Sequence, residues 1–242
     1  MSTVLRPSTV VISQQMLQEK TIEATAQNLS NAATVGFKAL AISGLEAPRK
    51  AYGEPVSYVK PTPYRRILDD GPAKQTSNPL DVAIRGEGYF QVQTPKGTRL
   101  TRAGQFQASP DNKLITSSGD YVLDVSGSPI TLNSKGGVYI GMDGTISDEK
   151  GKIGQKLGVY KVEKEQELTN VGYGLYQTTQ NPEAIEHPTL LQGYVEESNV
   201  TPITEITKMM QNLRSFENAQ RMIDIEDDRQ RKVINLSPKN SA

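Results

Sequence analysis

The 242-residue sequence contains no cysteine and no tryptophan, and its single histidine is His187. Without cysteine the chain forms no disulfide, no thiolate metal site and no cysteine nucleophile. A multi-histidine zinc site is impossible, and a Ser-His-Asp triad would have to use His187, which we place in a loop before Pro188. We therefore expect no catalytic residue, no cofactor and no metal, and we do not expect an enzyme.

The sequence also lacks an excess of charge and any long apolar run. Lysine and arginine together number 27, as do aspartate and glutamate, so bulk charge gives no attraction to nucleic acid or to anionic lipid. The apolar runs, such as residues 10–12, are far shorter than the roughly 20 residues of a membrane-spanning helix. The first residues do not resemble a secretory signal. We expect no nucleic-acid partner, no membrane insertion and no cleaved signal peptide.

Residues 8–33 contain no glycine and have the periodicity of an amphipathic helix with a narrow apolar stripe. The apolar positions recur at spacings that mix three and four: Ile12, Met16, Ile22, Ala26, Leu29 and Ala33. Pro7 is a suitable start for this helix. Gly36 is a suitable left-handed cap at its end, with Phe37 as the apolar contact beyond the cap.

Residues 201–236 predict a second helix, with Thr201 as the N-cap and Pro202 in the first helical position. Its apolar residues follow heptad spacing over about three repeats: Ile206, Met209, Leu213, Phe216 and Ile223. Two stripes as thin as these cannot enclose a full core. We expect the terminal helices to meet each other, as in a coiled coil, and to bury their remaining apolar surface by oligomerisation.

Between the helices, residues 78–195 carry glycine-rich turn signals about every ten residues, separated by short β-rich stretches. This pattern is typical of an antiparallel all-β domain. Residues 46–77 contain five prolines and no period, which indicates an extended connector. The predicted fold is α+β. Terminal helices at 1–36 and 198–242 form an assembly domain, 37–77 form the connector, and 78–197 form a β-rich outer domain.

Four stretches combine several chemically specific residues: 26–38 (AQNLSNAATVGFK), 77–90 (SNPLDVAIRGEGYF), 100–106 (LTRAGQF) and 193–200 (GYVEESNV), the last followed by RSFE at 214–217. In the first stretch, Asn28 and Asn31 lie three residues apart near a helix end, where their carboxamides can bond to neighbouring backbone. The first two stretches resemble the signatures A-N-N-L-A-N-x-x-T-x-G-F-K and N-P-L-D-x-A-I-x-G-x-G-F-F of the flagellar rod and hook proteins. Departures such as Gln27, Ser30 and Tyr194 are mild.

The resemblance, which runs along nearly the whole chain, implies a structural subunit of the rod of the bacterial flagellar basal body. Such a subunit packs its terminal helices into the rod that carries motor torque to the hook and filament, with its β-domain outward in the periplasm. It implies that the partners are other rod proteins, copies of the same chain and the flagellar type III export apparatus.

The expected assembly residues lie on both helices and at the end of the first: Met16, Asn28, Leu29, Asn31, Gly36, Phe37, Ile206, Met209, Leu213, Phe216 and Ile223. Among rod proteins the proximal type is favoured, because residues 39–42 follow the G-F-K motif without the longer insertion of the distal type. The distal rod protein is the alternative. A β-rich binding module is weaker, since it would not need two terminal helices with thin stripes.

Overall fold

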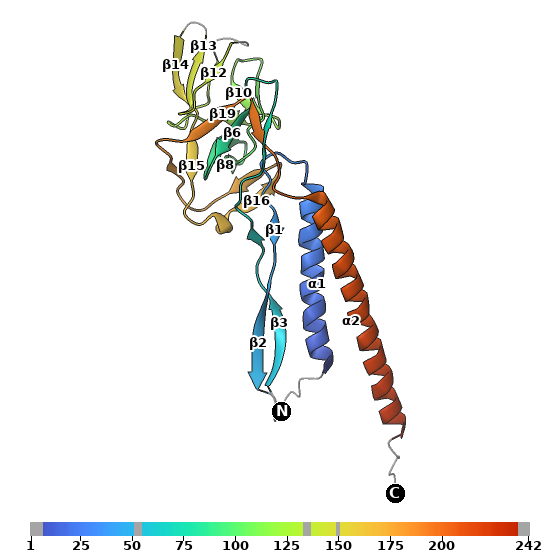
Figure 1. The fold of residues 1–242 in the computed structure, drawn as a ribbon. Helices are drawn as coiled ribbons and strands as arrows, with labels where there is room; N and C mark the ends of the chain where they lie inside the picture. Colours follow the sequence, from blue (N-terminus) through green and yellow to red (C-terminus); the bar gives the residue numbers. More distant parts are fainter. Residues whose placement is uncertain (1–6, 51–54, 133–136, 149–150, 237–242) are drawn as a thin grey trace. The chain divides into compact units, whose positions relative to one another are not determined.

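The computed structural model describes residues 7–50, 55–132, 137–148 and 151–236. Helix α1 (Pro7–Ser30) opens the described chain and helix α2 (Pro202–Leu236) closes it, with antiparallel strands between them (Figure 1). This confirms the predicted α+β class. Two compact units are present. Of the described residues, the helical unit contains those within 7–30, 40–67 and 201–236, and the β unit contains those within 31–39 and 68–200.

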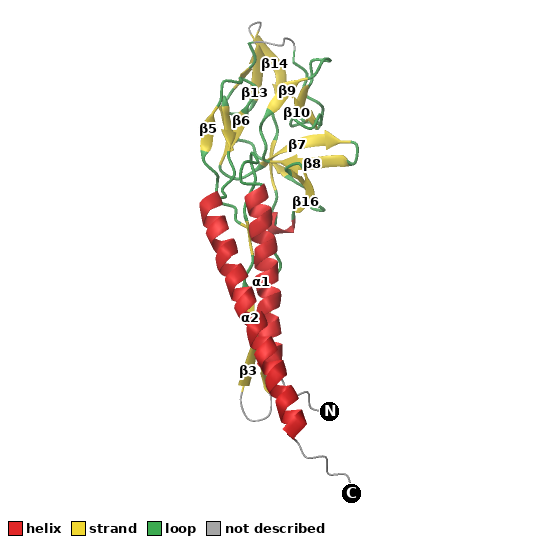
Figure 2. Cartoon of the chain, turned by 90° about the vertical axis from the view of Figure 1, so that its right-hand side faces the viewer, coloured by secondary structure: helices red, strands yellow, loops and turns green. Residues whose placement is uncertain are grey.

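In the helical unit, α1 and α2 lie side by side and run in opposite directions (Figures 1 and 2). Asn28 near the end of α1 contacts Glu205 near the start of α2. Gln15, in the first half of α1, donates to Gln220 at 3.1 Å, which lies in the second half of α2. Helix α2 begins at Pro202 as predicted, and the Thr201 carbonyl accepts the amides of residues 204 and 205. Neither helix, over its described residues, has both the length and the apolarity needed to cross a membrane.

The connector contains a β-hairpin of β2 (Gly44–Lys50) and β3 (Pro55–Pro61). The strands on either side of the hairpin, β1 (Leu40–Ala41) and β4 (Arg65–Arg66), form a short pair of their own. Strand β3 packs along α1, and the Val59 amide donates to the Ser13 hydroxyl at 3.2 Å. Pro48 pairs with Ser57 in this ladder. Because proline has no amide donor, its pair has to be one of the non-hydrogen-bonded pairs. The prolines made this segment read as extended and concealed its pairing.

The β unit is built on one antiparallel sheet. Its strand order is β16 (Thr169–Gly172), β17 (Leu175–Gln177), β8 (Gly97–Thr101), β7 (Tyr89–Thr94), β11 (Tyr121–Val122), β10 (Leu114–Thr116) and β9 (Phe106–Ala108), and β15 (Val159–Lys161) pairs with both β7 and β18 (Glu183–Ala184). Phe90 and Phe106 are fully buried and pack edge to face with ring centroids 5.1 Å apart. Such pairs are favourable beyond their buried area.

Smaller antiparallel ladders complete the β unit: β12 (Tyr139–Ile140), β13 (Thr145–Asp148) and β14 (Gly151–Lys156) form one sheet, β6 (Val82–Arg85) pairs with β19 (Thr189–Gln192), and β5 (Ala73–Gln75) pairs with β20 (Tyr194–Glu196). A single 3₁₀ turn, Glu165–Glu167, precedes β16. One continuous apolar core reaches from Val82 to Leu190 through these elements. The glycine-spaced turns thus predicted the architecture of this region correctly.

Candidate assembly site

Helix α2 has one stripe of side chains that are less exposed than their neighbours. They recur at alternating steps of four and three: Glu205, Met209, Asn212, Phe216, Ala219 and Ile223. This is coiled-coil spacing, and α1 is the element on which α2 packs. Three of the predicted assembly residues, Met209, Phe216 and Ile223, therefore belong to the contact between the two helices of one chain.

A second apolar stripe on α2 is left open to water. Its members are Ile203, Ile206, Met210 and Leu213, with 70%, 42%, 54% and 44% of their surface exposed. On α1, Met16 is also 55% exposed, whereas Leu29 is half-buried. The sequence treated Ile206 and Leu213 as part of one stripe with Met209 and Phe216. The structure separates the two sets, since Met209 and Phe216 are half-buried whereas Ile206 and Leu213 are exposed. Spacing alone does not distinguish them, because each set fits a heptad row.

Asn28 joins the two helices to the connector. Its amide nitrogen donates to the Leu40 carbonyl at 2.8 Å and to the Glu205 carboxylate at 3.0 Å, and its amide oxygen accepts the Leu40 amide at 2.8 Å. The side chain is buried, so these bonds satisfy a polar group that has left water. Lys208 pairs with the other oxygen of Glu205 at 2.7 Å. Asn28 therefore fixes the start of β1 against both helices.

Asn31, Gly36 and Phe37 belong to the β unit. Asn31 accepts the Thr34 hydroxyl within a turn, and Phe37 packs in a small buried cluster with Val200. Gly36 has the predicted left-handed conformation, with φ of +69°. It does not cap α1, however, because the helix already ends at Ser30. Short polar side chains there form local bonds that compete with the helix: the Ser30 hydroxyl donates to the Gln27 carbonyl at 2.9 Å, and the Thr34 hydroxyl donates to the Asn31 side chain at 3.2 Å.

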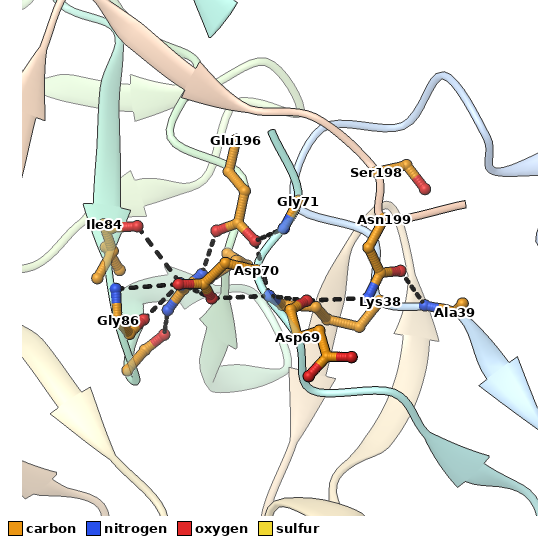
Figure 3. A network of polar contacts seen from close by, with 12 residues as sticks. Lys38, Ala39, Asp69, Asp70, Gly71, Ile84, Gly86, Glu196, Ser198 and Asn199 are labelled. Atoms are coloured by element: carbon orange, nitrogen blue, oxygen red, sulfur yellow. Dashed lines mark hydrogen bonds and ion pairs between the residues drawn. The ribbon is translucent and has the colours of Figure 1, made fainter. Parts of the chain in front are cut away.

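The turn after Gly36 meets a buried ion cluster (Figure 3). Glu196 accepts the ammonium of Lys38 at 2.7 Å and the Nε of Arg102 at 2.5 Å, and the three side chains are 4%, 4% and 3% exposed. The Asp70 carboxylate, 46% exposed, also pairs with both cations, with Lys38 at 3.1 Å and with Arg102 at 3.0 Å. Arg102 also donates to the carbonyls of Gly86 and Gly88. Every ammonium and guanidinium nitrogen in this cluster therefore has a partner.

Gly36 has to be glycine at this cluster for a second reason. Its amide donates to the Glu196 carbonyl at 2.7 Å, and a Cβ at this position would lie 2.6 Å from the carbonyl carbon of Arg102. All four sequence motifs thus converge on one place, because Gly86 and Gly88 belong to the second of them. Lys38, Arg102 and Glu196 are not among the residues predicted from the sequence for the site. A usable signal was that each is a charged residue within one of the four motifs.

The described residues contain no group of three or more potential metal-binding side chains, and apolar side chains of α2 are exposed to water. An antiparallel helix pair with such a stripe, together with a β unit that has its own apolar core, is typical of a structural subunit. Family models agree. One for the flagellar hook protein FlgE/F/G D1 domain matches residues 83–148, and one for the flagellar basal body rod FlgEFG protein C-terminal matches residues 191–236.

Curated relatives extend this agreement over most of the chain. Flagellar basal-body rod protein FlgF of Caulobacter vibrioides is 34% identical over 89% of this chain and 91% of its own length. FlgF of Mesorhizobium japonicum is 32% identical over 86% of this chain and 88% of its own length. FlgG of Caulobacter vibrioides is 27% identical over 87% and 91%. The chain belongs to the flagellar basal-body rod protein family, whose members are structural subunits of the rod and not enzymes.

Proposed function

We propose that the chain is the proximal rod subunit, of the type represented by FlgF. Two relatives from one organism support this assignment. The FlgF of Caulobacter vibrioides is 34% identical to this chain and its FlgG is 27% identical, over nearly the same share of the chain, 89% and 87%. The short segment between the G-F-K motif and β2 also favours the proximal type. The proposed position is in the part of the rod that crosses the periplasm.

The distal rod protein is the second candidate, because FlgG of Bacillus subtilis is 32% identical over 67% of this chain. Complementation distinguishes the two. In a strain that lacks its own FlgF, expression of this chain is expected to restore motility, whereas in a strain that lacks FlgG it is not. The reverse pattern would assign the chain to the distal rod.

The proposed mode of assembly uses the open stripe of α2, and the exposure of its apolar side chains is the observation that carries the proposal. Burying the exposed part of a residue such as Leu213 contributes about 1 kcal/mol, on the basis of roughly 25 cal/mol per Å² of apolar surface. In a rod this contribution recurs for each residue of the stripe and for each subunit. We propose other rod proteins and further copies of this chain as the surfaces that cover the stripe, and the flagellar export apparatus as the route to the rod.

The test replaces Leu213 with aspartate. Because Leu213 is 44% exposed and does not lie on the stripe that faces α1, the Leu213→Asp chain is expected to fold normally, with unchanged circular dichroism and melting temperature. It is expected to be absent from purified basal bodies, and the cells are expected to be non-motile. Phe216→Asp would be a poorer test, since Phe216 belongs to the contact with α1.

The matched control is Val125→Asp, which places the same charge at a side chain of similar exposure, 46%, on the β unit. This variant is expected to enter the rod. Normal incorporation of Leu213→Asp, or equal exclusion of both variants, would overturn the proposed role of the stripe.

A further inference from the structure

Residues 194–200, the last segment of the β unit, bond to two segments that come much earlier in the sequence. Strand β20 pairs with β5, and the Glu196 carbonyl accepts the Gly36 amide at 2.7 Å. Asn199 accepts the Ala39 amide at 2.7 Å and donates to the Asp69 carbonyl at 2.9 Å. Residues 194–200 therefore contact two earlier segments, 36–39 and 69–75, which also contact each other where Lys38 donates to the Asp69 carbonyl at 2.9 Å (Figure 3).

The charges make this arrangement dependent on Glu196. Lys38 and Arg102 are two buried cations, and Glu196 is the buried carboxylate that contacts both. Asp70 also contacts both, but nearly half of its side chain is in water, where attraction between charges is much weaker. Without Glu196 the cluster would keep two buried positive charges against one solvated negative charge. Removal of one partner from a buried ion pair is strongly destabilising for this reason.

The large apolar core of the β unit is made of other residues, and the Arg102 guanidinium reaches it by donating to the Ile84 carbonyl at 3.3 Å. Its buried members run from Val82 to Leu190 and include none of the residues of segments 36–39, 69–75 or 194–200. Phe37, Ala39 and Val200 form a separate small cluster. The structure thus has an apolar core and, outside it, a polar closure made from three distant parts of the sequence.

We infer that residues 194–200 act as a clasp that closes after the core has formed, and that Glu196 is its latch. Until Glu196 reaches Lys38 and Arg102, segments 36–39 and 69–75 are not fixed, although the core is complete. Segment 36–39 leads from α1 into β1, and segment 69–75 follows β4. The clasp therefore makes the ordered placement of these segments conditional on the chain having been completed through Val200. This inference does not depend on the type of rod subunit.

Hydrogen exchange on the purified full-length chain tests the clasp. Glu196→Gln preserves the size of the latch but removes its charge, and it replaces one of the two acceptor oxygens with an amide donor. We expect peptides covering residues 31–39 and 68–75 to exchange at least about 100-fold faster than in the unmodified chain, while peptides covering β7 and β11 keep their protection. Glu197→Gln is the matched control. Its carboxylate forms only a surface pair with Lys74, so no peptide is expected to change.

A second variant separates charge from packing. Lys38→Met combined with Glu196→Gln removes one buried cation together with the lost anion, and it is expected to recover at least about tenfold of the lost protection at residues 68–75. Equal loss of protection across core and clasp peptides in Glu196→Gln would overturn the inference, because the clasp would then be part of one cooperative unit. Unchanged exchange in that variant, or no recovery in the double variant, would overturn it too.

Discussion

The two units of this chain bury apolar side chains to very different depths. In the β unit, large residues such as Phe90, Phe106 and Leu114 are completely buried. In the described part of the helical unit, the apolar residues that are buried are two alanines, Ala24 and Ala219, which are 3% and 7% exposed. Since the hydrophobic contribution grows with buried apolar area, the β unit supplies its own stability and the helical unit has little of its own.

This difference is informative about function. Helices in proteins obtain most of their stability from packing an apolar face, and α2 leaves one of its two apolar stripes in water. The helical unit therefore has the composition of one side of an interface. The β unit has the composition of an independent domain. We propose that the helical unit serves assembly of the rod and that the β unit folds on its own.

Matched truncations of one phenylalanine in each unit are expected to give the largest change in the free energy of unfolding. Phe90→Ala, in the β core, is expected to lower the free energy of unfolding by about 3–5 kcal/mol, since it removes a fully buried ring. Phe216→Ala, on the half-buried stripe between the helices, is expected to cost about 1–2 kcal/mol by the same relation scaled to its partial burial. Urea unfolding followed by circular dichroism measures both. Equal losses would contradict the claimed difference between the units.

A smaller effect is expected at the junction of the sequence motifs. Gly36→Val combines a left-handed φ of +69° with a clash against the Arg102 backbone, and we expect a loss of about 2 kcal/mol or more. Gly127→Val is the control. Gly127 has a φ of +81°, but no atom lies within 4 Å of the added Cβ, so strain alone is expected to cost about 1 kcal/mol. Thermal unfolding compares the two. A milder effect at Gly36 than at Gly127 would show that the close approach is not restrictive.

The smallest effect concerns surface charge on α2. Arg229, bonded to both oxygens of Glu226 at 2.8 Å, and Gln230 lower the pKa of Glu226 from 4.5 to about 2. A lowered carboxyl pKa gives a contribution that is complete above about pH 4.5 and is lost as the pH falls toward 2. Because Arg229 is exposed and Glu226 is only partly buried, the contribution of the pair to stability is expected to be slight and weakened by salt. An NMR titration of Glu226 with a midpoint near 4.5 would contradict the pairing.

Much of the fold could be predicted because its signals are local. The three- and four-residue spacing predicted both helices, the Thr201–Pro202 pair predicted the start of α2, and recurring glycine turns predicted the antiparallel strands. The helical pattern predicts an end of α1 near residue 33, with Gly36 as its cap, whereas the helix ends at Ser30. There, a left-handed glycine was read as a helix cap, although its conformation serves a contact with Arg102 instead.

The remaining features depend on contacts that a sequence does not display. The choice between Phe216 and Leu213 for the face toward α1 depends on how the helices are rotated, and the heptad pattern fits both. The ion cluster joins Lys38, Arg102 and Glu196 from three motifs that are distant in sequence, so only the folded chain brings them together.

We propose that the open stripe of α2 is covered only in the assembled rod. Hydrogen exchange of α2, compared between the dilute purified chain and isolated basal bodies that contain it, tests this most directly. We predict rapid exchange along α2 in the free chain and at least about 100-fold slower exchange in the rod, with the amides of β7 and β8 equally protected in both. Equal protection of α2 in the two states would contradict the account.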